Sequence, residues 1–134
     1  MQFNCRKEDI QEALQRVERA ISRKHSPLPV LTGVHMEAKE DGTVIVQASD
    51  YDLSIRTEFL ASVKKPGIVL IPGVFLTSLI RKVPSETVEF TYQEEDRKVK
   101  VESGSADFTL LTIPAADFPI LNEINTENKI SLKD

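Results

Sequence analysis

The sequence is poor in residues that cross-link a chain or bind metals. Its 134 residues include one cysteine, two histidines, five glycines and no tryptophan. The single thiol, Cys5, excludes an intramolecular disulfide and a cysteine-based zinc site, and the few glycines form no phosphate-binding loop. No apolar run approaches the roughly 18 residues of a membrane span, and the first residues lack a signal peptide's hydrophobic region. We expect a soluble, cytoplasmic protein without a metal ion or cofactor.

Groups capable of catalysis are also few. Cys5, His25 and His35 are the only thiol and imidazoles, and a Cys-His pair is the one nucleophilic arrangement they could form. Cys5 falls in a predicted strand, however, where a cysteine is usually a small buried hydrophobic residue. Acidic residues gather in predicted turns at 50–52 and 94–96, where carboxylates cap the backbone and stay solvated. We expect no catalytic residues and no enzyme, and a Cys-His enzyme remains the minor alternative.

Charge is distributed unevenly along a chain whose length fits one domain. The 17 Lys and Arg against 21 Asp and Glu give a net charge of −4. Between residues 14 and 25, four cations and one anion give +3, which leaves −7 for the remainder. The net acidity argues against nucleic-acid binding over the whole surface, but it does not exclude a local basic patch.

The clearest local pattern predicts a helix over residues 7–23. Apolar residues recur at the spacing of one buried helical stripe, and acidic residues occupy the first turn, where the helix dipole favours anions. The prolines of Ser26-Pro27-Leu28-Pro29 exclude a continuation. The stripe consists of Ile10, Leu14, Val17 and Ile21.

The remaining pattern predicts a duplicated unit of one strand, one helix and three strands. Alternation and turn residues predict strands at 1–6, 31–39, 43–48, 53–61, 68–71, 87–93, 98–103 and 106–113. A second helix of about ten residues opens at Pro72 and closes at Pro84. Residues 1–62 and 67–113 therefore form two half-repeats. We expect an α+β fold with two helices side by side on one face and antiparallel sheets outside them.

The pattern changes after residue 113. Prolines bound a turn at residues 114–119, residues 122–128 are polar, and residues 130–132 resemble the start of a strand. We expect a domain over residues 1–121, followed at 122–134 by a linker and the first strand of a second domain.

Basic side chains follow one ridge of the first helix and reappear in the second. Arg16, Arg19 and Arg23 lead to Lys24 and His25, and the second helix ends in Arg81 and Lys82. One interpretation is a solvated face whose cations complement the helix C-terminal dipole. The other is a surface that faces phosphates without reading sequence, because no recognition helix accompanies it.

Several short segments, taken together with their order and spacing along the chain, resemble the N-terminal domain of the bacterial DNA polymerase III beta subunit, the sliding clamp. They are Met1-Gln2-Phe3, Leu28-Pro29-Val30-Leu31, Ser49-Asp50-Tyr51-Asp52-Leu53, Pro66-Gly67, Ile71-Pro72, Ser103-Gly104 and Pro114-Ala115-Ala116-Asp117-Phe118-Pro119. The resemblance implies a DNA-clamp fold and a non-catalytic processivity factor. It implies a head-to-tail homodimeric ring of three-domain chains around duplex DNA, with polymerase and clamp loader bound through later domains. The alternative is a stand-alone protein-interaction module with a clamp-like fold that does not bind DNA.

The resemblance also implies site residues. The family's first-domain DNA-contacting arginine aligns with His25, beside Lys24, so the contact takes a different form here. We expect the DNA-binding set to be Arg16, Arg19, Arg23, Lys24, His25, Arg81 and Lys82. The implied dimer contact comprises Val74, Phe75, Ser78, Ser105, Asp107, Phe108 and Leu110. Core packing is the alternative role for the phenylalanine and leucine at 108 and 110.

Overall fold

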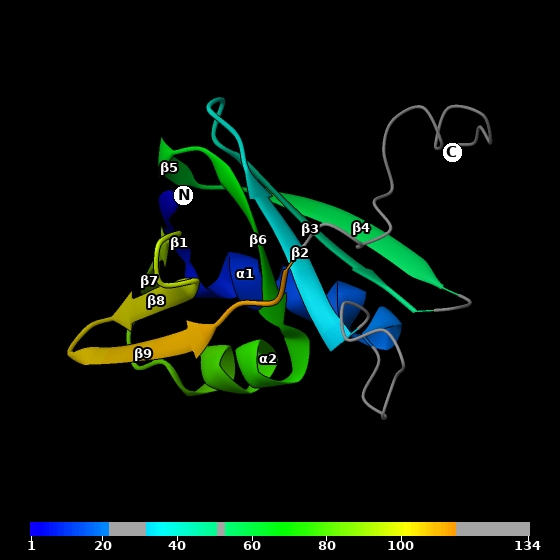
Figure 1. Ribbon diagram of the computed structural model, residues 1–134. Coiled ribbons are helices and arrows are strands. Elements are labelled where there is room, and N and C mark those ends of the chain that lie inside the picture. The colour runs from blue at the N-terminus through cyan, green and yellow to red at the C-terminus, as the bar shows by residue number, and fades with distance from the viewer. Residues whose placement is uncertain (22–31, 51–52, 115–134) are drawn as a thin grey trace.

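Two antiparallel sheets and two helices build the part of the chain that the structure, a computed structural model, describes: residues 1–21, 32–50 and 53–114 (Figure 1). One sheet has the strand order β5-β1-β7-β8-β9, and the other has the order β4-β3-β2-β6. The elements are β1 (Gln2–Arg6), α1 (Lys7–Val17), the 3-10 helix η1 (Glu18–Ala20), β2 (Gly33–Ala38), β3 (Thr43–Ser49), β4 (Ser54–Leu60), β5 (Ser62–Lys65), β6 (Gly67–Pro72), α2 (Gly73–Lys82), β7 (Thr87–Gln93), β8 (Lys98–Ser103) and β9 (Ala106–Leu111).

The two half-repeats exchange their first strands. β1, from the first half, pairs with β7 of the second, and β6, from the second half, pairs with β2 of the first. Each half therefore depends on the other to complete its sheet. The predicted order of one strand, one helix and three strands occurs twice, with β5 between the two copies, and the predicted α+β architecture is confirmed.

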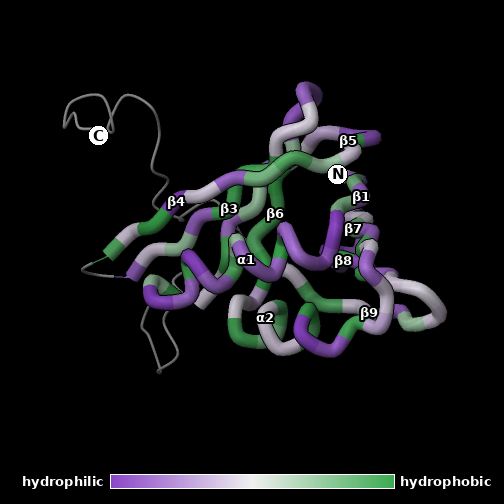
Figure 2. The backbone as a smooth tube through the Cα atoms, turned by 180° about the vertical axis from the view of Figure 1, so that it is seen from behind, coloured by the Kyte–Doolittle hydropathy of each residue, from purple (hydrophilic) through white to green (hydrophobic). Residues whose placement is uncertain are grey.

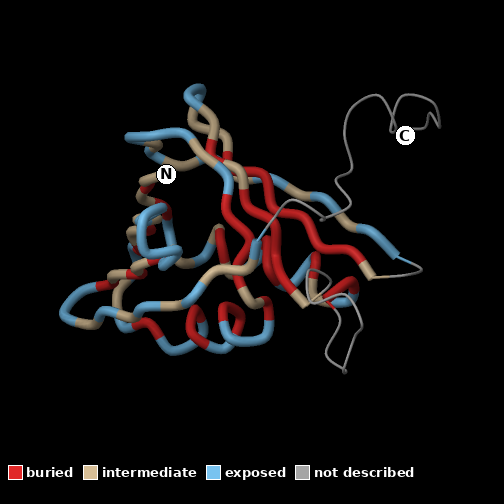
Figure 3. The backbone as a smooth tube through the Cα atoms, viewed as in Figure 1, coloured by how far each residue is buried: buried red, intermediate tan, exposed pale blue. Residues whose placement is uncertain are grey.

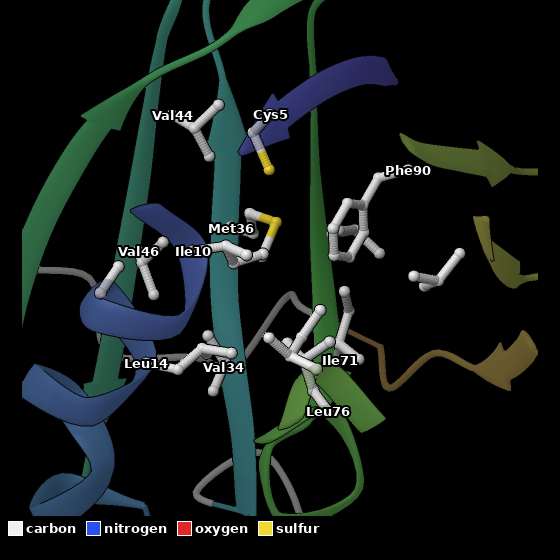
Figure 4. Packing of buried hydrophobic residues seen from close by; sticks show 14 of the residues in the cluster. Cys5, Ile10, Leu14, Val34, Met36, Val44, Val46, Ile71, Leu76 and Phe90 are labelled. Atoms are coloured by element: carbon white, nitrogen blue, oxygen red, sulfur yellow. The ribbon is translucent and has the colours of Figure 1, made fainter. Parts of the chain in front are cut away.

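The core lies between the sheets and the helices. Figure 4 shows the side chains of Ile10 and Leu14 from α1, Met36 from β2 and Phe90 from β7 directed into one interior. Phe90 stacks on Phe3 with ring centroids 5.0 Å apart, and both residues are fully buried. The stack joins β1 to β7, so the best-packed aromatic contact lies where the two half-repeats meet.

Burial alternates strictly in β4, whose residues switch between exposed and half-buried along its length. That alternation fits an end strand with one face toward the core and one toward solvent. β2 and β3, in the middle of the same sheet, are buried on nearly every residue (Figure 3).

The predicted helix over residues 7–23 was too long. α1 ends at Val17, η1 closes with a bond from the Ile21 N–H to the Glu18 carbonyl at 3.1 Å, and Ile21 is extended. Ile21 packs so closely on Gly73 that a Cβ on the glycine would lie 2.8 Å from the isoleucine Cγ2. Apolar spacing cannot detect this ending, because an α-helix and a final 3-10 turn bury the same residues over so short a stretch.

β5 was not predicted. Residues 64–67, Lys-Lys-Pro-Gly, have the composition of a loop, yet β5 pairs antiparallel with β1, with Phe3 opposite Val63. Long-range pairing supplies the hydrogen bonds that local propensity does not indicate. Its exposed lysines, Lys64 and Lys65, also suit the end strand of a sheet, because charge there discourages pairing with another chain.

Gly42 should tolerate no larger residue. The predicted Asp-Gly turn is confirmed: Gly42 has φ +96°, and the Asp41 carboxylate accepts a 2.9 Å bond from the Thr43 N–H. A Cβ at Gly42 would lie 3.2 Å from the Ala61 carbonyl oxygen. We expect Gly42→Ala to lower the free energy of unfolding by about 1–2 kcal/mol in urea titrations. Ser62→Ala, on an exposed position nearby, should change it by less than about 0.5 kcal/mol, and equal effects would contradict the strain argument.

Candidate nucleic-acid and subunit interfaces

The two helices lie antiparallel. At one end the Lys7 ammonium donates a 3.0 Å hydrogen bond to the Val83 carbonyl, just beyond α2. At the other end Ile21, just beyond η1, packs on Gly73, the first residue of α2. Figure 2, viewed from behind, shows α1 in front of the four-stranded sheet and α2 below α1. The pair therefore forms one helical surface with residues from both half-repeats.

Four of the predicted DNA-binding residues lie exposed on this surface. Arg16 is in the last turn of α1, Arg19 is in η1, and Arg81 and Lys82 are in the last turn of α2. Arg81 Nη2 lies 3.6 Å from Glu18 Oε1. The side chain of Arg81 therefore extends from the last turn of α2 to η1, where Glu18 precedes Arg19. The other three predicted residues, Arg23, Lys24 and His25, lie outside the described residues.

Acidic residues on the same surface reduce its positive charge. Arg16 Nη2 lies 2.9 Å from Glu12 Oε1, one helical turn earlier. Over residues 7–20, three basic side chains stand against four acidic ones. The i,i+4 spacing of Glu12 and Arg16 could have indicated the first ion pair from sequence. The pair between Glu18 and Arg81 could not be anticipated, because it depends on how the helices pack.

The predicted dimer residues divide into two groups. Figures 1 and 2 both show α2 beside β9, which is an end strand of the five-stranded sheet. Phe108 and Leu110 are half-buried and pack against the core, whereas the others are exposed. The exposed group comprises Val74, Phe75, Ser78, Ser105 and Asp107. Phe108 and Leu110 therefore contribute to core packing and remain partly exposed.

Leu111 was missed by the sequence analysis. It is 66% exposed, the same fraction as Phe75. Its orientation follows from the period of two in a strand, because Leu110 points inward and its neighbour must point outward. We use the name α2–β9 surface for four exposed residues of these two elements, Val74, Phe75 and Ser78 on α2 and Leu111 on β9.

The thiol and the described imidazole do not form a catalytic pair. Cys5 is buried in the core, and burial, reinforced by the Asp9 charge, raises its pKa to about 12. His35 points to the other face of β2 from Met36, which faces the core with Cys5, and burial lowers its pKa. A buried thiol with so high a pKa is a poor nucleophile. His25 lies outside the described residues.

Neither helix in the described ranges is long and apolar enough to cross a membrane. Over the same ranges, no three His, Cys, Asp or Glu side chains group as metal ligands do.

Comparison with known proteins places this chain and its fold in one family. Residues 1–122 match the family described as DNA polymerase III beta subunit, N-terminal domain. The chain belongs to this family.

Relatives agree in sequence and in structure. The beta sliding clamp of Micrococcus luteus is 34% identical over 92% of this chain and 39% of its own length. The beta sliding clamp of Bacillus subtilis is 29% identical over 98% of this chain and 36% of its own length. The crystal structure of the Bacillus subtilis clamp superposes with a TM-score of 0.85, covering 92% of this chain and 34% of that one. The chain thus spans less than half the length of the relatives it matches.

Proposed function

We propose that this chain forms the N-terminal domain of a DNA sliding clamp subunit, a cytoplasmic, non-catalytic processivity factor. The whole subunit would close head to tail as a homodimeric ring around duplex DNA and hold the replicative polymerase, with the polymerase and clamp loader bound through other domains. The observation that carries the proposal is the match of residues 1–122 to the clamp family. The exchanged half-repeats and the helical surface built from both of them support it.

The proposed domain covers residues 1–121, with half-repeats 1–62 and 67–113, and residues 122–134 would supply a linker and the first strand of a second domain. The strand exchange supports treating the two half-repeats as one folding unit. The α2–β9 surface, together with Ser105, Asp107, Phe108 and Leu110, is the proposed dimer contact.

DNA contact is proposed for the helical surface. Guanidinium and ammonium groups attract phosphates, and contacts to phosphates position a protein without reading base sequence. The proposed contacts are Arg16, Arg19, Arg23, Lys24, His25, Arg81 and Lys82. Such contacts let a protein slide along a duplex, because each phosphate is equivalent to the next.

The 134-residue chain should bind duplex DNA weakly and without sequence preference. About four neutralised phosphates predict a slope of about −3.6 for log K against log salt. Arg19→Glu should make the slope shallower by about one, because Arg19 is exposed on η1 and has no ion pair among the described residues. Fluorescence anisotropy of a labelled duplex at several salt concentrations measures both quantities.

Lys98→Glu is the matched control for this measurement. Lys98 is exposed on β8, outside the helical surface, and its substitution changes the net charge by the same amount. Equal slopes for Arg19→Glu and Lys98→Glu would contradict a DNA contact by the helices. Salt-independent binding, or none, would favour the protein-interaction module instead.

A further inference from the structure

We infer that Glu12 and Glu18 tune the affinity of the helical surface for phosphates by each holding one arginine in an ion pair. This inference rests on the proposed function and adds to it which residues set the strength of the contact. Its ligand class is the duplex phosphate backbone. Its basis is the pairing of two of the four described cations on the proposed DNA surface, Arg16 and Arg81.

The first pair lies along α1. Glu12 and Arg16 are four residues apart on the exposed face, and their side chains meet at 2.9 Å. The other guanidinium nitrogen, Nη1, lies 3.5 Å from Thr57 Oγ1 on β4. The guanidinium of Arg16 is thus directed toward the helix's own carboxylate and the adjacent strand, and a phosphate would have to compete with both.

The second pair crosses between the half-repeats. Glu18, in η1, lies 3.6 Å from Arg81, in the last turn of α2. The Glu18 side chain is 28% exposed and that of Arg81 is 55% exposed, so the carboxylate is the more sheltered partner. The carboxylate therefore stays beside the arginine, whereas the arginine remains accessible from solvent.

A paired arginine gains less from a phosphate than an unpaired one. When an unpaired cation neutralises a phosphate, a condensed counterion is released, and this release produces the salt dependence of binding. An arginine whose charge is already balanced by a carboxylate adds little net charge to the surface. Of the four proposed DNA contacts that the structure describes, Arg19 and Lys82 are then the two that form no ion pair within the described residues.

These two ion pairs are expected to contribute little to the free energy of unfolding. Exposed ion pairs contribute little to folding, because water and salt screen them and two long side chains must be ordered. Loss of either carboxylate should therefore leave the fold intact while changing the charge that faces the duplex. This difference separates affinity tuning from a structural role.

The test uses the 134-residue chain with Glu12→Gln or Glu18→Gln, titrated into a fluorescently labelled 20-base-pair duplex over a range of salt concentrations. Glutamine keeps the shape and one acceptor oxygen, exchanges the other oxygen for an NH2 donor, and removes the charge. Each variant should steepen the log–log salt slope by about 0.9 and, at 0.1 M salt, tighten binding by up to about eightfold, as one added phosphate contact requires.

Glu102→Gln is the matched control. Glu102 pairs with Lys100 at 3.9 Å on β8, outside the helical surface, and its substitution changes the net charge equally. A second variant identifies the partner: in the Arg81→Gln background, Glu18→Gln should no longer tighten binding beyond this control. Circular dichroism checks the fold, and Glu12→Gln tests the inference independently if Glu18→Gln unfolds.

The outcomes are distinguishable. If the wild-type chain binds the duplex and both Glu→Gln variants match Glu102→Gln in slope and affinity, the inference is overturned and the proposed function stands. If neither the wild-type chain nor any of these variants binds, both are overturned. Steeper slopes for Glu12→Gln and Glu18→Gln, with the second lost in the Arg81→Gln background, support the inference.

Discussion

Replacing Phe90 with alanine is expected to lower the free energy of unfolding by about 3–5 kcal/mol, a large part of the stability of a domain of this size. Phe90 is fully buried on β7, and its ring stacks on that of Phe3 on β1 at 5.0 Å and 11°. Truncation would leave a cavity between two strands from different half-repeats, where few groups can move to fill it. Urea titration followed by circular dichroism measures the loss.

Phe75→Ala makes the same chemical change on the surface. The Phe75 side chain is 66% exposed on α2, so its truncation should change the stability of the chain by less than about 0.5 kcal/mol. Similar midpoints for the two variants would show that the stack between β1 and β7 does not hold the half-repeats together.

Replacing Phe75 with glutamate should instead disrupt assembly. In the full-length protein we expect Phe75→Glu to weaken the proposed dimer by at least about 30-fold, since truncating or charging a central aromatic residue typically costs about 2 kcal/mol or more. Phe75, Val74 and Leu111 are exposed apolar residues on adjacent elements, an arrangement that suits burial against a partner. Sedimentation velocity over a concentration series measures the dissociation constant.

Ile68→Glu controls for a new charge on an exposed apolar residue. Ile68 is 47% exposed on β6, in the other sheet, and points away from the core that its neighbour Val69 enters. Ile68→Glu should leave the dimer intact. Leu111→Glu should weaken the dimer as Phe75→Glu does. A Phe75→Glu protein that remains dimeric at nanomolar concentration would refute the proposed interface.

Local patterns predicted most of the elements but not the partners of the strands. The stripe of Ile10, Leu14 and Val17 indicated α1, and the Asp-Gly turn at Gly42 indicated the hairpin of β2 and β3, because both depend on residues close in sequence. The exchange of β1 and β6 depends on pairing between distant segments, which periodicity does not encode. The short strand β5 was missed for the same reason.

The candidate site shows the same division. Sequence spacing indicated the arginines at 16 and 19 as solvent-facing, and they are exposed. A count of charges along the chain includes Glu18, but it does not show that Glu18 lies beside Arg81, because that contact forms only when the helices pack. The exposure of Leu111 also required the position of β9 in its sheet, although strand alternation suggests its direction.

The strand exchange has a consequence for how the chain folds during synthesis. β1 is translated before the other elements described here, yet it lies inside its sheet between β5 and β7, and the Gln2 side chain donates a hydrogen bond to Glu89 across 87 residues of sequence. Contacts of such long range slow folding, because a long loop must close before any pairing energy is gained. The N-terminal strand must therefore wait for most of the domain to be translated, and a nascent chain that stops after β4 has no complete sheet to form.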